Sequence, residues 1–229
     1  METLPDPNAR SPHGSESEPL DEEHSVAWSV AQRYGLRDRE VPVTMAGEGM
    51  PRRAWTVDQI MAMNEAGIIH ENERFELIGG EVIPMNSKGI FHERVKGWLT
   101  EAIIRTKPDD VALITETTFR LSADTFVEPD VLLFSRADGL ENVSGTNALL
   151  VIEVSDSTRR IDLGSKSEIY AAFGVREYWS VDAREHHVTV YREPTPLGYR
   201  RRFEVMRGEP ARPHLIDGLA LDFSKVDEF

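Results

Sequence analysis

The sequence predicts a single α/β domain in which a helix, three strands, a second helix and a further strand follow one another. Three observations predict this order: apolar residues at helical spacing in one segment, three short apolar runs after it, and a second helical segment that ends at a glycine before another apolar run. In chain order these segments are 92–106, 111–121, 126–135, 148–155, 163–173 and 176–182. The chain has 229 residues, of which 40% are hydrophobic, enough for one domain with its own core.

The first 50 residues differ in composition from the rest of the chain. They are rich in Pro, Ser, Gly and acidic residues, and acidic residues outnumber basic ones there. Segments of this kind bury too little apolar surface to offset the entropy lost on ordering. We therefore expect residues 1–50 to form a largely disordered acidic region and residues 51–229 to form the domain.

The domain is expected to begin with a helix and a hairpin. Thr56 is a good N-cap for a helix over 57–66, and Gly67 is placed to end it. In the following segment, 74–85, two short apolar runs flank the pair Gly79-Gly80. A glycine pair between two such runs is typical of a two-residue hairpin turn.

The central elements rest on periodicity. Val95, Leu99 and Ile103 recur at helical spacing within 92–106. The run 148–155 is apolar for almost five consecutive residues, as expected for a strand buried on both faces. The strand at 176–182 is expected to pair with the next apolar run, and the segments 199–209 and 215–229 are expected to be peripheral strands and a tail.

Two carboxylates stand beside these apolar strands. Asp130 comes directly before the run Val-Leu-Leu-Phe, and Glu153 follows four aliphatic residues. Burying an ionised carboxylate without a partner is costly, so Glu153 should be paired, protonated or bound to a cation. A strand-end salt bridge would also explain Glu153 taken alone. If the two strands pair, however, the carboxylates lie close together, and a divalent cation is the usual remedy for their repulsion.

A third candidate lies in the helix that follows. Asp162 and Lys166 are four residues apart and share a helix face. One interpretation is a surface ion pair, which contributes little to stability. The other is that Lys166 reaches over the strand ends to a water molecule or a phosphate.

The net charge of −14 at pH 7 restricts the function. A protein that grips a phosphate backbone generally needs a positive face. A nucleic-acid role must therefore depend on bound metal ions or on local basic clusters, such as Arg159-Arg160 and the run from Arg200 to Arg202. A solvated strand end explains the arginine run equally well.

Cysteine and hydropathy exclude other classes of site. The chain has no cysteine, so disulfides and thiolate metal sites are excluded, and a reducing cytoplasm is the expected location. No apolar run approaches the roughly 20 residues needed to span a bilayer, so we expect no membrane association.

Four segments of the chain are informative together: RFELIGGEVIPM, FVEPDVLLFS, LLVIEVSDST and DLGSKSEIYAAFGVREYWSVD. In this order they resemble the Uma-type restriction endonuclease family, a branch of the PD-(D/E)XK nuclease superfamily. The resemblance covers about residues 54–229. It implies a restriction-endonuclease-like αβββαβ core with a mixed central sheet, to which an N-terminal helix and hairpin and C-terminal strands are added.

The resemblance also implies roles for individual residues. Pro129-Asp130 matches the "PD" of the motif, which makes Asp130 a metal ligand, and Glu153 matches the "(D/E)" position as a second ligand. Ser155 stands where the motif has its lysine, and Lys166 in the next helix is the match for the displaced lysine. We expect Ser155 to be a hydrogen-bonding partner, because no acyl-transfer triad surrounds it.

Glu76 and His92 match two further family positions. Glu76 is expected either to complete the metal shell or to hold Lys166, although a plain hairpin glutamate is an equal alternative. His92 is expected to bind a phosphate, to orient a water molecule or to cap its helix.

The leading functional hypothesis is a DNA endonuclease that uses Mg²⁺, or alternatively Mn²⁺. The competing hypothesis is a nuclease-fold protein that binds nucleic acid or protein without cutting, which the net charge and Ser155 favour. Many nucleases of this fold act as dimers because two DNA strands require two sites, so a homodimer is expected by analogy.

Overall fold

A computed structural model of the chain describes residues 43–45, 51–70, 72–156 and 163–229. The expectation of disorder before residue 43, the pair Arg159-Arg160 and the ion pair of Asp162 with Lys166 lie outside the described residues. A short strand, β1 (Val43–Met45), pairs with β2 (Pro51–Arg53). The sequence had indicated no element at either position.

The centre of the molecule is a mixed six-stranded sheet. Its strand order is β12-β11-β10-β9-β8-β5. Among these strands β9 and β10 are parallel, while the other neighbours are antiparallel. The strands are β5 (Val111–Ile114), β8 (Val131–Ser135), β9 (Leu150–Ser155), β10 (Glu177–Asp182), β11 (Val188–Thr195) and β12 (Gly198–Val205).

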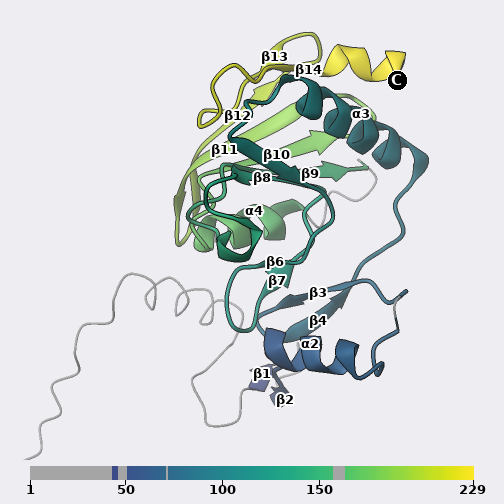
Figure 1. Cartoon of the computed structure of the whole chain (residues 1–229), viewed down its shortest axis with the longest axis vertical. Helices are drawn as coiled ribbons and strands as arrows, with labels where there is room; N and C mark the ends of the chain where they lie inside the picture. Colours follow the sequence, from purple (N-terminus) through teal and green to yellow (C-terminus); the bar gives the residue numbers. More distant parts are fainter. Residues whose placement is uncertain (1–42, 46–50, 71, 157–162) are drawn as a thin grey trace, which may run out of the picture.

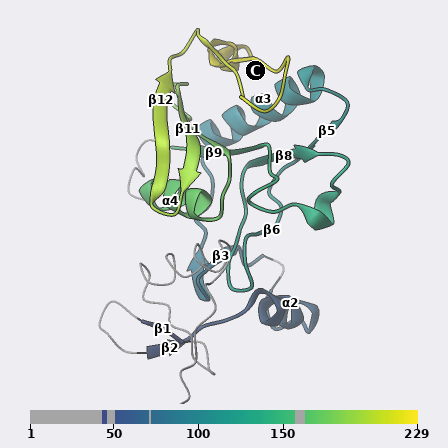
Figure 2. The same cartoon turned by 90° about the vertical axis from the view of Figure 1, so that its left-hand side faces the viewer.

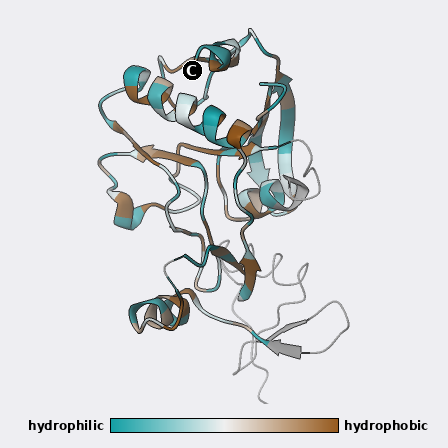
Figure 3. Ribbon diagram, turned by 90° about the vertical axis from the view of Figure 1, so that its right-hand side faces the viewer, coloured by the Kyte–Doolittle hydropathy of each residue, from teal (hydrophilic) through white to brown (hydrophobic). Residues whose placement is uncertain are grey.

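Two helices cover opposite faces of this sheet (Figures 1 and 2). Helix α3 (Ile90–Thr106) packs on one face together with alternate residues of β8 and β9, such as Val131 and Ile152. Helix α4 (Leu163–Ala172) is the crossover between β9 and β10 and packs on the other face through Tyr170. Figure 3 shows the apolar strands in brown between these helices, and brown and teal residues along α3, as in an amphipathic helix.

A smaller four-stranded sheet lies below the central one in Figure 1. Its order is β4-β3-β7-β6, and helix α2 (Val57–Glu65) packs on it through Val57 and Ile60. Its strands are β3 (Phe75–Ile78), β4 (Glu81–Pro84), β6 (Phe119–Arg120) and β7 (Phe126–Val127).

The predicted starts and turns of this part are confirmed. Thr56 caps α2 in a capping box with Gln59, and Gly67 follows the helix with φ +68°. Gly79 and Gly80 join β3 to β4 with φ values of +57° and +80°, as a two-residue turn of this kind requires.

The prediction was wrong where it treated 111–121 and 126–135 as unbroken strands. The first divides into β5 and β6, and the second into β7 and β8, with one part in each sheet. Glu116 has φ +50°, which extended strands do not accommodate. Pro129 lacks the N–H that a central strand would use. The chain therefore crosses between the two sheets at these points.

The remaining elements are η1 (Leu140–Asn142), β13 (Pro210–Ala211), β14 (Leu221–Asp222) and η3 (Phe223–Glu228). Leu221, Phe223 and Val226 are buried in the core that α3 covers, so the C-terminal segment is not the peripheral tail that was expected. In the part of the chain that the structure describes, none of the helices has the length and hydropathy required to cross a bilayer.

Candidate active site

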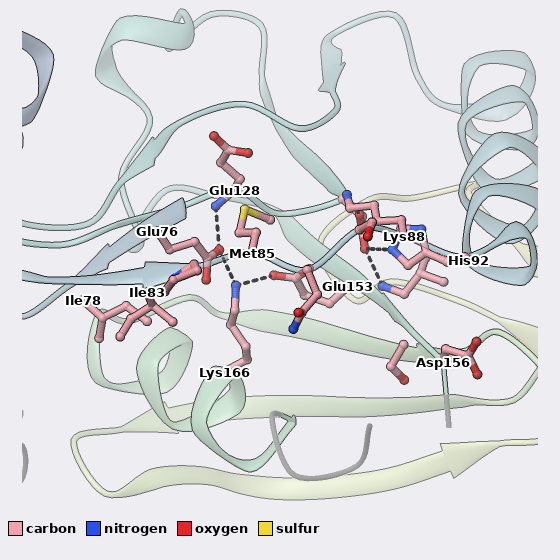
Figure 4. A pocket seen from close by; sticks show the side chains of 17 residues that line it. Glu76, Ile78, Ile83, Met85, Lys88, His92, Glu128, Glu153, Asp156 and Lys166 are labelled. Atoms are coloured by element: carbon pink, nitrogen blue, oxygen red, sulfur yellow. Dashed lines mark hydrogen bonds and ion pairs between the residues drawn. The ribbon is translucent and has the colours of Figure 1, made fainter. Parts of the chain in front are cut away.

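A cavity of about 510 Å³ opens where the two sheets meet (Figure 4). The smaller sheet contributes β3 and β4 to its wall, and the central sheet contributes the end of β9. The segment 85–89, which connects β4 to α3, lines a further side. Every residue that the sequence indicated for the site lies on this wall: Glu76, His92, Asp130, Glu153 and Lys166.

Lys166 is held between two glutamates from different sheets (Figure 4). Its Nζ lies 2.5 Å from Oε1 of Glu76 on β3 and 3.1 Å from Oε1 of Glu153 on β9. Glu76 is almost fully buried, and the same Oε1 accepts a 2.9 Å hydrogen bond from the backbone N–H of Glu128. Of the alternatives proposed for Glu76, the structure has the one in which it holds Lys166.

Tyr170 completes the surroundings of Glu153. Its hydroxyl donates a 2.7 Å hydrogen bond to Oε1 of Glu153, and its ring is fully buried. Lys166 and Tyr170 are four residues apart on α4, so both reach Glu153 from one face of the helix. This role of Tyr170 was not predicted, although its i, i+4 spacing to Lys166 is a signal in the sequence.

Burial and neighbouring charges shift the ionisation of this group. Burial raises the pKa of Glu153, the ammonium of Lys166 acts against that, and the carboxylates of Asp130 and Glu76 raise it further. Burial alone would lower the pKa of Lys166, but the charges of Glu153 and Glu76 outweigh it and raise the pKa. Lys166 is therefore cationic at neutral pH, and a further cation would favour the ionised form of Glu153.

Asp130 lies opposite Glu153 at the start of β8. Val131 pairs with Ile152, so extending this register by one residue brings Asp130 to Glu153. The two strands do pair, which was the condition for the two carboxylates to lie close together. Oδ2 of Asp130 accepts a 2.8 Å hydrogen bond from the backbone N–H of Val154 and lies 3.0 Å from Nε2 of His92.

Oδ2 of Asp130 contacts His92 on α3, whereas Oε1 of Glu153 contacts Lys166 and Tyr170 on α4, and both residues line the one cavity. Burial acts to raise the pKa of Asp130, but the hydrogen bond and charge of His92, together with Lys88, lower it. Asp130 is thus an anion over the whole neutral range, with the ammonium of Lys88 already beside it.

His92 does not cap its helix. Helix α3 begins at Ile90 after the N-cap Gly89, which makes no side-chain cap hydrogen bond, so His92 lies within the first turn. There the imidazole is 7% exposed and contacts Asp130. The interpretation of His92 as a helix cap is therefore wrong.

The sequence analysis missed two residues beside Asp130. Nζ of Lys88 lies 2.6 Å from Oδ1 of Asp130 and 2.7 Å from Oε1 of Glu116. Lys88 belongs to the segment 85–89, which has no periodic pattern, and Glu116 was placed inside a predicted strand. No sequence signal marked either residue.

The acidic residues fit a divalent cation of the kind predicted. Asp130 and Glu153 line the same cavity from adjacent strands, and Mg²⁺ is commonly held by one or two carboxylates while it retains several waters. Within residues 51–70, 72–156 and 163–229 no three acidic or histidine side chains converge on one metal position. A cation here would accordingly depend on Asp130, Glu153 and water, and a direct bond from Glu76 stays a prediction.

Ser155 is a hydrogen-bonding partner, as expected. It donates a 3.3 Å hydrogen bond to the carbonyl of Val181.

The solved structures that match this chain include two of very different similarity. One is a crystal structure from Anabaena variabilis ATCC 29413, described as a putative nuclease belonging to DUF820. It has a TM-score of 0.61 and 16% identity, over 76% of this chain and 98% of that one. The other, a cryo-EM structure of a DrdV–DNA complex, has 16% identity over 50% of this chain and 9% of that one. Its TM-score of 0.29 carries no argument about the fold.

Comparison with curated proteins gave no match. The sequence model of one family, Uma2, described as "Putative restriction endonuclease", matches residues 57–223. The matched region includes every residue of the cavity discussed above and far more than half of the chain. The nuclease-like fold and the family match agree, and the chain belongs to the Uma2 restriction endonuclease family.

Proposed function

We propose that this protein is a metal-dependent nuclease that hydrolyses phosphodiester bonds in DNA. In this proposal Asp130 and Glu153 bind Mg²⁺, and Lys166 supports the attacking water. The observation that carries it is that two carboxylates and an ammonium, from three separate elements, line one open cavity. Family membership supports a nuclease, and DNA is the substrate that a restriction endonuclease would cut.

The side chains have distinct tasks in this mechanism. Bound Mg²⁺ supplies Lewis-acid chemistry, polarising a phosphoryl oxygen and acidifying a water molecule. Lys166 provides a fixed positive charge next to Glu153, where negative charge develops on the phosphate in the transition state. Glu76 keeps that ammonium in place. His92 and the N–H of Val154 hold Oδ2 of Asp130 in one orientation.

A cation at this site also addresses the overall charge. The chain carries −14, so a polyanion meets general repulsion. Lys88 and Lys166 already bring two ammonium groups to the cavity wall, and a divalent cation adds further local positive charge. Binding in this proposal is thus restricted to the site, which suits an enzyme that needs to contact only the phosphates around the bond it cuts.

The test is cleavage of plasmid DNA by purified protein with Mg²⁺ or Mn²⁺, and with EDTA. Asp130→Asn and Glu153→Gln should each lower the cleavage rate by about 100-fold or more, the scale on which a preorganised electrostatic contact acts. Glu101→Gln, which removes an exposed carboxylate of α3, is the matched control. Circular dichroism spectra should be unchanged. If Asp130→Asn and Glu153→Gln both cut at the wild-type rate, the mechanism is wrong.

A second candidate function is a nuclease-fold module that binds without cutting. The observation that favours it is that both oxygens of Asp130 already contact protein groups, Lys88 at Oδ1 and His92 at Oδ2. In that case calorimetry should detect no Mn²⁺ binding that Asp130→Asn abolishes. Carboxylate-dependent Mn²⁺ binding would reject this candidate.

A further inference from the structure

We propose that Lys88 is a second functional lysine of this site. It competes with the divalent cation for Asp130 and, once displaced, is held by Glu116 where it contacts a phosphate oxygen of the substrate. This inference deepens the nuclease function proposed above and rests on it. It concerns a residue outside the family motif segments, in the connection between β4 and α3.

Lys88 lies between two carboxylates on the cavity wall. Its Nζ bridges Oδ1 of Asp130, at 2.6 Å, and Oε1 of Glu116, at 2.7 Å. The side chain is 13% exposed and lies on the cavity wall (Figure 4). The ammonium therefore neutralises Asp130 from the side of the cavity and occupies Oδ1. Because His92 and the N–H of Val154 occupy Oδ2, a cation has to displace Lys88 to reach Oδ1.

The backbone and the carboxylate of Glu116 are both held in place. Its backbone N–H donates a 3.1 Å hydrogen bond to the carbonyl of Pro129, which places it beside Asp130. Its φ of +50° is uncommon for a residue other than glycine, and such conformations gather at functional sites. Lys96 also contacts its carboxylate, at 3.0 Å. The hydrogen bonds from Lys88 and Lys96 outweigh burial and lower the pKa of Glu116 to about 2.

These two partners give Lys88 two separable contacts. If a cation takes Asp130, the ammonium loses one carboxylate but keeps Glu116, which is anionic at any working pH. It then stays at the cavity with hydrogen-bond donors available to a phosphate oxygen. With Asp130 alone, displacement would leave the ammonium without a counter-ion. Glu116 is thus the positioning residue for Lys88.

Lys166, the other lysine of the cavity, has less freedom to bond the substrate. Ser155 stands at the motif lysine position, and Lys166 is committed to two carboxylates, Glu76 and Glu153. Two of its three donors are directed at those oxygens, so it acts mainly as a fixed charge. Lys88 has only one partner left after metal binding and is the better placed of the two to bond the substrate directly.

Lys96 provides a matched control. It also contacts Glu116 and is 14% exposed, nearly the same as Lys88. It does not line the cavity. Lys88→Met and Lys96→Met therefore remove the same charge from the same carboxylate, but only the first removes it from Asp130 and the cavity.

The experiment measures two quantities on the full chain: Mn²⁺ affinity by titration calorimetry, and the DNA cleavage rate at saturating Mn²⁺. Lys88→Met should bind Mn²⁺ about 3- to 10-fold more tightly and yet cleave about 10-fold or more slowly. Lys88→Arg, which keeps the charge, should recover part of the cleavage rate. Lys96→Met should change neither quantity by more than about 2-fold. Glu116→Gln should weaken Mn²⁺ binding, because Lys88 then relies on Asp130 alone.

Either of two results with Lys88→Met overturns the inference. An unchanged Mn²⁺ affinity in Lys88→Met shows that Lys88 does not compete for Asp130. Cleavage at or above the wild-type rate in Lys88→Met shows that Lys88 only obstructs the metal. In both cases a wild type that cleaves keeps the nuclease function intact. A wild type that cleaves no DNA overturns the nuclease function itself, whatever the calorimetry of Lys88→Met shows.

Discussion

The hydroxyl of Tyr170 donates a 2.7 Å hydrogen bond to Oε1 of Glu153, the same oxygen that Lys166 contacts at 3.1 Å. The ring of Tyr170 is locked by burial and lies 4.9 Å from the ring of Tyr178, centroid to centroid. A rigid donor on one oxygen fixes how the carboxylate is turned and leaves the other oxygen for a cation. Groups of this kind are usually as important to a metal site as part of its ligand set.

We therefore expect Tyr170→Phe to raise the Mn²⁺ concentration required for half-maximal cleavage by about 10- to 100-fold. Only Lys166 would then hold Oε1 of Glu153, so the carboxylate would be fixed less firmly. The loss should be largest at low metal concentration and should shrink at saturation. A metal titration of the cleavage rate measures this.

The control for Tyr170→Phe is Tyr199→Phe. Tyr199 belongs to the same group of tyrosines, with its ring centroid 6.5 Å from that of Tyr178, but its hydroxyl donates to the carbonyl of Val175. It should lower stability without changing the metal requirement. Equal metal requirements in the two variants would mean that Tyr170 contributes to packing alone.

Removal of the Lys166 charge should strongly destabilise the fold. Lys166→Met leaves Glu76 and Glu153 facing one another without a counter-ion, and breaking a buried pair in this way costs about 3–5 kcal/mol. The double variant Lys166→Met with Glu76→Gln should recover part of that loss, because one of the two like charges is gone. Urea unfolding of the single and double variants gives the coupling free energy. Strictly additive effects would contradict the interaction.

Glu153 should make the stability of the wild type depend on pH. Its pKa in the fold is raised above the ordinary value of 4.5, chiefly by burial. The stability linked to its proton is fully present below the ordinary value and is lost as pH rises through the raised pKa. Glu153→Gln cannot ionise, and Lys166 keeps Glu76 as a partner. The free energy of unfolding of this variant should exceed that of wild type by an amount that grows as the pH rises above 4.5.

Thermal unfolding across that range measures the difference. A gain of ~1 kcal/mol corresponds to about 2–4 °C in a chain of this size. A constant difference at every pH would show that the Glu153 proton is not linked to folding in metal-free protein.

Gly80 should tolerate no side chain. A Cβ at this position would lie 2.5 Å from Cβ of Ala54 and 3.0 Å from the backbone N of Trp55, in addition to requiring φ +80°. Gly67 has a similar φ of +68° but nothing within 4 Å. Gly67→Ala should therefore cost only the ~1–2 kcal/mol of a left-handed residue. Gly80→Ala should cost about 1–3 kcal/mol more, as overpacking does. Urea midpoints of the two variants measure this, and equal values would argue against the contact with Ala54.

The parts of the fold that were predictable from sequence depend on local chemistry. A capping threonine, a glycine pair and i, i+4 apolar spacing are each satisfied within a few residues. For that reason α2, the β3–β4 hairpin and α3 were found at their places. The order of the central elements followed from the same signals, and the pairing of β8 with β9 followed from that order.

The errors occurred where long-range contacts determine the backbone. Glu116 has φ +50°, its N–H donates to the carbonyl of Pro129, and its carboxylate forms ion pairs with Lys88 and Lys96. All of these partners lie far from Glu116 in the sequence. Its immediate neighbours in the sequence indicate none of this. The division of the two long strands between two sheets depends on that crossing, so periodicity alone extended each of them too far.

The site was predictable to a similar extent. Apolar surroundings indicated Glu153, and the family resemblance indicated Asp130, Lys166, Glu76 and His92. Lys88 escaped notice because it lies in an irregular connection, where only the three-dimensional path of the chain decides which groups it meets. Tyr170 escaped notice because a buried aromatic residue and a hydrogen-bond donor look the same in a sequence.

Lys166 also connects the two halves of the molecule. Glu76 comes from the smaller sheet and Glu153 from the central one, so a single ammonium forms ion pairs with both sheets. If the smaller sheet unfolds locally, Lys166 loses Glu76 while the central sheet stays folded. The stability of the contact between the two sheets and the ability of the cavity to bind should therefore change together. A ligand that binds in the cavity should also protect strands of the smaller sheet that it does not contact from local unfolding.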